Sequence, residues 1–254
     1  MNRSIAFNTI LIREVKRFIR IWPQTILPPV ITTSLYFLIF GTLIGARIGD
    51  MDGRPYMEYI VPGVVLMSVI SNSYGNVVSS FYSTKFQRHI EELLIAPVPN
   101  WVILSGYVGG GVVRGLCVGI VVALISCIFT RMTVLHTGVA LGILLLTAIL
   151  FSLAGFINAT FANSFDDISI VPNFVLTPLS YLGGVFYSIH LLPEIWQKIS
   201  LANPILYMVN AFRYGLIGVS DIDIVLAFLM VTLFIVVLVF ISLFLLHRGT
   251  GIKI

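Results

Sequence analysis

Residues that could carry enzyme chemistry are few and scattered in this 254-residue chain. The sequence has no glycine-rich phosphate loop ending in Lys and Ser or Thr, no His-Glu-x-x-His signature and no Gly-x-Ser-x-Gly turn. Its four histidines lie between apolar runs or at their ends, where no two could share a metal inside a run. We therefore expect no catalytic centre, no metal and no directly bound cofactor. Any nucleotide chemistry would have to come from another polypeptide.

Arg114 is the one cation well inside a predicted membrane span, the apolar run 102–129. A charge at such depth costs about 2.5 to 3.5 kcal/mol on insertion scales, so an intramembrane arginine indicates function by default. A structural role competes with this, because the guanidinium could pair with carbonyl groups, pair with an acid of a neighbouring helix, or extend toward the cytoplasmic face. The sequence favours the structural role and leaves the functional one open.

A short polar segment, 84–97, is the second candidate site. Thr84 could cap a helix there and Pro97 would end it. Such a helix could dock on a cytoplasmic motor and transmit its movement, or it could be a mere linker on the membrane surface. The predicted apolar stripe and the charges around it are Phe86, Ile90, Leu93 or Leu94, and Lys85, Arg88, Glu91 and Glu92.

Membrane-spanning helices must position these residues. With 58% hydrophobic and 10% charged residues, the chain has too little charge to cover a water-facing surface, so lipid must be its solvent over much of its length. A helix needs about 20 apolar residues to span the hydrocarbon core. We therefore predict an all-α integral membrane protein with a single domain, 1–254, and six transmembrane helices. The six apolar runs are 21–46, 59–84, 102–129, 139–162, 168–188 and 224–246.

The cations indicate how the chain is oriented. Six spans place both termini on one side, and Lys and Arg favour the cytoplasmic side of short loops. If the termini are cytoplasmic, the inner set is larger than the outer set, so we predict this orientation. The inner set is Arg3, Arg13, Lys16, Arg17, Arg20, Lys85, Arg88, Arg248 and Lys253, and the outer set is Arg47, Arg54, Arg131, Lys198 and Arg213. The net charge of +4 does not indicate nucleic acid, because these cations form no patch with interleaved aromatic residues.

The N-terminal segment 5–22 has the pattern of an amphipathic helix. We predict an interfacial helix whose cations face anionic lipid; a solvated helix packed on a soluble partner is the alternative. The apolar face is Leu11, Val15, Phe18 and Trp22 with Ile12 and Ile19 beside it, and the polar face is Arg13, Lys16, Arg17 and Arg20.

The segment 189–219 fits neither a span nor a simple loop, because polar residues and prolines interrupt an apolar run. A pair of short helices that re-enters the outer leaflet would explain this pattern, provided that the polar backbone is buried in protein or lines water.

Glycines and prolines indicate how two spans pack. Gly106 and Gly110 are four positions apart, and so are successive members of Gly111, Gly115 and Gly119, a spacing that lets helix backbones approach closely. We favour a neighbour within this chain over a second copy. Pro172 and Pro178 each remove a backbone hydrogen bond from the run 168–188, so we predict a kink there.

Several motifs in order resemble the ABC-2 type permeases over nearly the whole chain. The motifs are Glu91-Glu92-Leu-Leu-Ile-Ala-Pro-Val-Pro, Gly106-Tyr-Val-Gly-Gly-Gly, Phe165-Asp-Asp-Ile-Ser, Pro178-Leu-Ser-Tyr-Leu-Gly-Gly-Val-Phe-Tyr-Ser, Asn203-Pro-Ile-Leu-Tyr and Phe212-Arg-Tyr. The resemblance implies a six-span fold with an N-terminal interfacial helix, a cytoplasmic coupling helix and an outer re-entrant pair. It also implies a homodimer in the bacterial inner membrane that joins two copies of a separate ABC ATPase and exports its substrate on ATP hydrolysis.

The resemblance also implies two groups of site residues. One group would contact the ATPase from the coupling helix, and the other would form the signature of the re-entrant pair. The first is Phe86, Gln87, Arg88, Glu91 and Glu92, and the second is Asn203, Pro204, Tyr207, Phe212 and Arg213.

The main alternative is an ATP-independent channel or secondary transporter. That class predicts ionisable residues along several spans, and only Arg114 is available. An intramembrane enzyme would need a nucleophile and a base at one depth, and a membrane anchor would need no ATPase partner.

Overall fold

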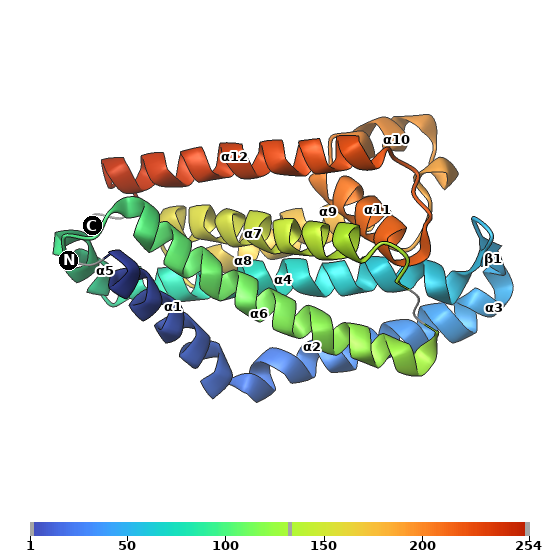
Figure 1. The fold of residues 1–254 in the computed structure, drawn as a ribbon, viewed down its shortest axis with the longest axis horizontal. Coiled ribbons are helices and arrows are strands. Elements are labelled where there is room, and N and C mark those ends of the chain that lie inside the picture. Colours follow the sequence, from blue (N-terminus) through green and yellow to red (C-terminus); the bar gives the residue numbers. More distant parts are fainter. Residues whose placement is uncertain (1–2, 132–133, 252–254) are drawn as a thin grey trace.

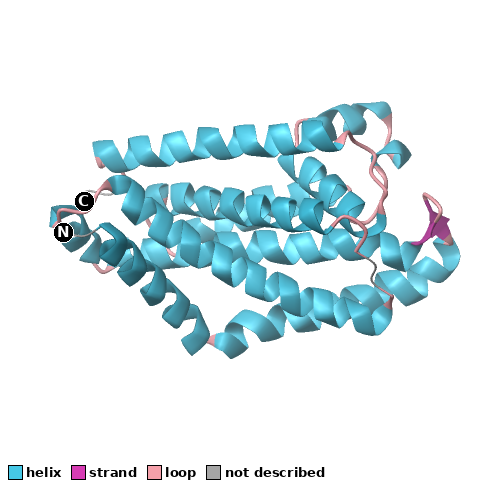
Figure 2. Ribbon diagram, viewed as in Figure 1, coloured by secondary structure: helices cyan, strands magenta, loops and turns pink. Residues whose placement is uncertain are grey.

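The computed structural model describes residues 3–131 and 134–251. Helices dominate, and long ones lie side by side along the longest axis (Figures 1 and 2). The described strands form one antiparallel two-residue hairpin, β1 (Asp50–Met51) and β2 (Arg54–Pro55), at one end of the bundle.

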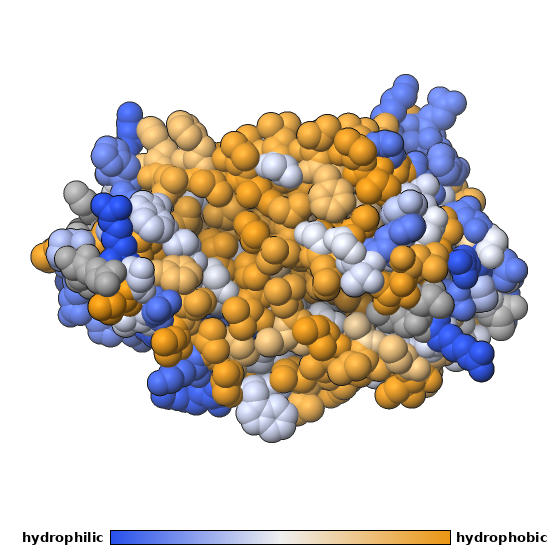
Figure 3. All heavy atoms as spheres, viewed as in Figure 1, coloured by the Kyte–Doolittle hydropathy of each residue, from blue (hydrophilic) through white to orange (hydrophobic). Residues whose placement is uncertain are grey.

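Within the described residues, five helices are long and apolar enough to cross a membrane. Their apolar surface forms a belt between two ends where hydrophilic residues gather (Figure 3). This distribution is what a bilayer requires, because its hydrocarbon core is about 30 Å thick and its boundaries are polar. The five helices are α2 (Trp22–Tyr36) with its π-helical continuation η1 (Phe37–Ile44), α4 (Tyr56–Phe86), α6 (Asn100–Phe129), α7 (Thr137–Phe161) and α12 (Ile224–Arg248).

The predicted fifth span, 168–188, is shorter and less regular than expected. It is helical from Asp167 to Leu182, with a π-helical segment that begins at Pro172. Proline donates no backbone hydrogen bond, and here the Thr177 hydroxyl donates to the Pro172 carbonyl at 2.9 Å. A kink was predicted at Pro172 and Pro178; the structure has a π-helical segment from Pro172, and a membrane span over 168–188 stays a prediction. The three parts are α8 (Asp167–Val171), η2 (Pro172–Leu176) and α9 (Thr177–Leu182).

The first and last described residues lie at the same end of the bundle (Figure 1). The opposite end carries the hairpin, and the predicted re-entrant segment 189–219 also folds there as short helices. One of these helices, α11, packs against α4, α7 and α12; insertion of the pair into the outer leaflet stays a prediction. The elements at this end are α3 (Gly45–Ile48), η3 (Ile189–Leu191), α10 (Glu194–Leu201) and α11 (Pro204–Ile217).

The glycines of α6 allow close packing within this chain. A Cβ atom at Gly106 would collide with Ile10, and one at Gly115 would collide with Ser73. These neighbours lie on α1 (Arg3–Arg20) and on α4. The preference for an intrachain neighbour is therefore confirmed at these positions.

The N-terminal helix packs on the bundle through a face that shares only Phe18 with the predicted apolar face. Glu14 is fully buried, whereas Ile12 and Ile19 are exposed. The Arg17 side chain, assigned to the lipid-facing side, donates instead to Asn76 on α4. The prediction was wrong here because the glycine-rich face of α6 admits the face of α1 that carries Ala6, Ile10, Glu14 and Phe18.

The short cytoplasmic helix begins later than predicted. It is α5 (His89–Ile95), within the predicted range 84–97. Thr84 does not cap it, because α4 continues to Phe86 and the Thr84 hydroxyl donates to the Ser80 carbonyl. The chain reverses at Arg88, whose φ of +60° is a left-handed conformation. The side chain of Leu94 lies outside the described residues.

Candidate functional site

The residues predicted to contact an ATPase lie together where α4 meets α5. We call them the α4–α5 corner, and all five are exposed. Phe86 is 62% exposed at the end of α4, whereas Ile90 is 1% exposed and holds α5 against the bundle, so the two residues do not form the single apolar stripe that was predicted. The acids lie in the first turn of α5, where a helix favours negative charge. The five residues of the corner are Phe86, Gln87, Arg88, Glu91 and Glu92.

The base of this corner is bound to the end of α7. The buried Lys85 ammonium donates to the carbonyl oxygens of Thr160 at 2.9 Å and Ala162 at 2.8 Å. These carbonyls belong to the last turn of α7 and its C-cap, where cations are favoured. The Phe86 ring also meets the Phe165 ring edge-on, with centroids 5.3 Å apart. Movement of the corner therefore cannot be confined to α5.

The loop after α7 is closed by Asp167. Its carboxylate accepts hydrogen bonds from the backbone of Asn163 at 2.8 Å and of Ser164 at 3.1 Å. The Asn163 amide, then the Ser164 side chain, hold the pKa of Asp167 below its ordinary value, because they favour the charged carboxylate. Phe165, whose ring contacts Phe86 of the corner, belongs to this loop.

An ion pair within α1, between Glu14 and Arg17, is hydrogen-bonded to α4. Glu14 accepts a hydrogen bond from the Ser80 hydroxyl at 2.6 Å and lies 3.5 Å from the Arg17 Nε atom. Arg17 in turn donates to both the backbone carbonyl and the side-chain oxygen of Asn76, each at 2.8 Å. The sequence analysis missed Glu14, because a single acid among cations indicates a solvated surface. Its spacing of four residues from both Ile10 and Phe18 indicates that the three residues share one face of a helix.

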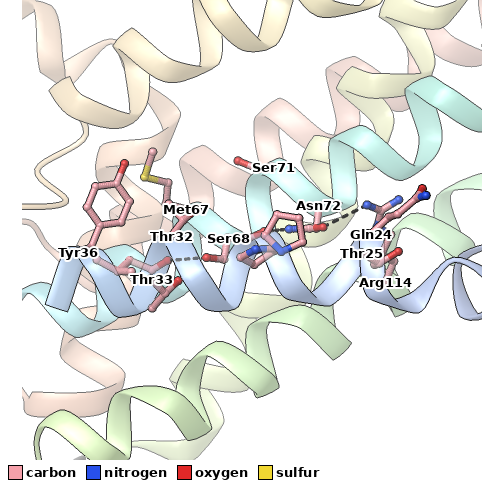
Figure 4. A pocket seen from close by; sticks show the side chains of 13 residues that line it. Gln24, Thr25, Thr32, Thr33, Tyr36, Met67, Ser68, Ser71, Asn72 and Arg114 are labelled. Carbon is pink, nitrogen blue, oxygen red and sulfur yellow. Dashed lines mark hydrogen bonds between the residues drawn. The ribbon is translucent and has the colours of Figure 1, made fainter. Parts of the chain in front are cut away.

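A groove of about 340 Å³ runs between α2, α4 and α6. At one end the Arg114 guanidinium donates to the Asn72 side-chain oxygen at 3.3 Å (Figure 4). Asn72 is itself oriented by donating to the Ser68 carbonyl at 3.0 Å. Arg114 thus pairs with a carbonyl oxygen, that of the Asn72 side chain, which was one of the three predicted structural alternatives. The lining residues are Gln24, Thr25, Pro28, Pro29, Thr32, Thr33, Tyr36, Val64, Met67, Ser68, Ser71, Asn72 and Arg114.

The predicted re-entrant signature forms structural contacts at the opposite end. Asn203 caps α11 by accepting from the Ile205 amide at 3.0 Å, and it donates to the Leu179 carbonyl at 2.6 Å. Arg213 is fully buried, donates to the Gly184 carbonyl at 2.6 Å and lies over the Tyr59 ring at 3.9 Å from the centroid. The remaining signature residues are Pro204 in the first turn of α11, Tyr207, whose hydroxyl donates to Leu201, and the buried Phe212.

Comparison with known proteins identifies the family. The ABC-2 type transporter family matches residues 5–217. The chain belongs to the ABC-2 type transporter family. It is 57% identical to the inner membrane transport permease YadH of Escherichia coli strain K12 over 250 residues, which cover 98% of this chain and 97% of YadH. It is also 26% identical to nodulation protein J of Sinorhizobium fredii over 182 residues, which cover 71% of this chain and 69% of that protein.

Membership of the ABC-2 family makes this chain a membrane permease subunit of an ABC transporter. The likeness to YadH and the apolar helices support a multi-pass protein of the inner membrane. In this ABC-2 permease the α4–α5 corner and the α2–α4–α6 groove are distinct sites. The corner lies at the end of α4, whereas the groove is reached by residues from the middle of α4 and α6, such as Asn72 and Arg114.

Proposed function

We propose that this permease is the membrane-spanning half of an ATP-driven exporter, working as a homodimer with two copies of a separate ATPase subunit. ATP is bound by the partner subunits, both termini are cytoplasmic, and the six predicted spans carry the substrate outward. The observation that supports this best is the α4–α5 corner, whose exposed residues lie at the end of a single 31-residue helix.

The geometry of α4 makes this transmission physically reasonable. A helix of this length extends about 46 Å, enough to cross the whole hydrocarbon core. Because Lys85 binds the end of α7 and Ile90 holds α5, a force on the corner acts on both central helices. ATP can shift the spans only if the partner binds one of two arrangements better, and the corner is where that difference in contacts would arise.

The proposed dimer would use one of the apolar faces that the bundle leaves uncovered. Large apolar side chains are exposed along α2 with η1 and along α12, including Ile31, Leu38 and Phe240. Lipid can cover both faces, and a second copy needs only one of them. We place the transport pathway between the two copies, because a single bundle of this size leaves little room for an enclosed channel.

The experiment reverses the charge of the corner. Glu91→Lys together with Glu92→Lys, in the purified complex with its ATPase, should lower the coupled ATP hydrolysis at least about tenfold by weakening docking. Glu194→Lys is the matched control, because this acid is exposed on α10 at the opposite end and should leave hydrolysis unchanged. If the double variant kept full hydrolysis and full association with the ATPase, the corner would not be the docking site.

A further inference from the structure

The groove between α2, α4 and α6 contains a cation with no opposite charge beside it. Arg114 is the only charged residue among its lining residues, and it takes part in none of the ion pairs found between described residues. Its Nε atom is buried without a hydrogen-bond partner. Glu14, the buried acid of the bundle, is already bound to Ser80 and Arg17.

This arrangement is costly unless an anion enters the groove. A cation in the middle of a span is destabilising when only a neutral amide contacts it, since a single neutral hydrogen bond offsets little of the lost hydration. A phosphate or carboxylate oxygen would accept charge-assisted hydrogen bonds from the planar guanidinium. Asn72 holds the guanidinium from the side of α4, so that the remaining donors stay available.

The two ends of the groove differ in the side chains that line them. Arg114, Gln24 and Asn72 lie together at one end, and Tyr36 and Met67 lie at the other (Figure 4). Between them the hydroxyls of Thr32 and Ser68 line the wall. A volume of about 340 Å³ is at the lower end for ligand pockets, so it holds a headgroup rather than a whole lipid.

We propose that this groove binds the anionic headgroup of an amphiphile, with a phosphate or carboxylate on Arg114 and its apolar chain along the exposed face of α2. Two sources share this chemistry, a phospholipid of the bilayer and the transported substrate. The proposal rests on the proposed function only for the placement of α2, α4 and α6 in a membrane.

The test measures bound lipid directly. The full chain is purified from vesicles of equal parts phosphatidylglycerol and phosphatidylcholine with identical acyl chains, and retained lipids are counted by native mass spectrometry. The unchanged chain should retain phosphatidylglycerol in excess. Arg114→Gln should retain about one anionic lipid fewer per chain and lower the excess about tenfold, as expected for a lost charge-assisted hydrogen bond. Arg114→Lys should keep most of it.

Two further variants show whether the loss of anionic lipid is specific to Arg114 and to the groove. Arg20→Gln removes an exposed cation of α1 and should not remove the lipid that depends on Arg114. Thr32→Phe fills the groove from an exposed position on α2 without touching Arg114, and it should lose the same lipid. If the unchanged chain showed no preference for the anionic lipid, or if Arg114→Gln and Thr32→Phe both kept it, the proposal would be wrong.

A second measurement, on the complex with the ATPase, distinguishes the two sources. ATP turnover releases the Arg114-dependent lipid if the groove holds the transported substrate. It leaves the lipid bound if the lipid is a fixed part of the protein. Binding is measured without ATP, so failure of the ATPase coupling would leave the binding result intact.

Discussion

Buried charges hold the N-terminal helix in place. Glu14 is inaccessible to solvent and contacts both Ser80 and Arg17, while Arg17 also binds Asn76. A buried ion pair stabilises little beyond an apolar pair of equal volume, but removal of one partner leaves the other without compensation. The hydrogen bonds that Glu14 and Arg17 form with Ser80 and Asn76 therefore fix where α1 lies on α4 more than they stabilise the bundle.

Removal of the Glu14 carboxylate should destabilise the chain. Glu14→Ala leaves the Ser80 hydroxyl and part of Arg17 without a partner, so we expect the free energy of unfolding to fall by about 3 kcal/mol. Glu14→Gln keeps an acceptor for Ser80 and should cost about half as much. Thermal unfolding of the purified chain in detergent measures both. Glu194→Ala, an exposed acid on α10, is the control, and equal melting temperatures for all three would contradict the assignment.

Few of these side-chain contacts could be predicted from the sequence. Arg114 stood out because it is a lone cation in an apolar run, but nothing in the sequence indicates Asn72 as its partner, since the two residues lie 42 positions apart. Lys85 was counted among the exposed charges of a short helix, yet it is buried against the end of α7. Periodicity reports the face of one helix and contains no information about which helix covers it.

Close contact between α6 and α4 determines the centre of the bundle. Gly111 faces Val77 and the Ser73 carbonyl, and Gly115 faces the Ser73 side chain, so the two helices pack closely. Packing between helices in lipid depends on such van der Waals contact, because burial of apolar surface provides no driving force there.

A methyl group on this face should separate the helices. Gly115→Ala brings a Cβ atom into the buried Ser73 side chain and within 3.3 Å of the Val69 carbonyl, so we expect a loss of about 1 to 3 kcal/mol. Gly75→Ala is the matched control, because its added Cβ meets no atom within 4 Å beyond its chain neighbours and the backbone of its own helix. Chemical unfolding of the two variants in mixed micelles compares them. A Gly115→Ala chain as stable as Gly75→Ala would contradict this packing.

The spans were predicted well where hydropathy is continuous and poorly where backbone geometry intervenes. The runs 102–129 and 224–246 correspond closely to α6 and α12. The run 168–188 is helical only to Leu182; it contains a π-helical segment from Pro172, and the chain turns at Gly184, whose φ is +70°. Average hydropathy does not detect such breaks.

The two ends of the molecule differ in what they carry. One end has α1, α5 and the α4–α5 corner, and the other has the hairpin and α10 (Figure 1). The apolar belt separates them (Figure 3). Under the proposed orientation the first end is cytoplasmic and meets the ATPase, and the second faces outward.

Labelling of intact cells tests this orientation. In a Cys117→Ser, Cys127→Ser background, Glu194→Cys on α10 should react with a membrane-impermeant maleimide added outside. Ile95→Cys, at the exposed end of α5, should react only after the cells are permeabilised. The opposite pattern would place the α4–α5 corner outside and remove any access to a cytoplasmic ATPase.

The most direct test of the coupling is a distance between the two copies in the complete transporter. Spin labels at Ile95→Cys, in the same cysteine-free background, report the separation of the two α5 helices with and without ATP in a complex whose ATPase is trapped before hydrolysis. We predict that ATP shifts this distance by about 5 Å, the size of one helical turn seen in switching interfaces. A distance distribution that stays the same while ATP is bound would contradict the proposal that the α4–α5 corner transmits the movement of the motor.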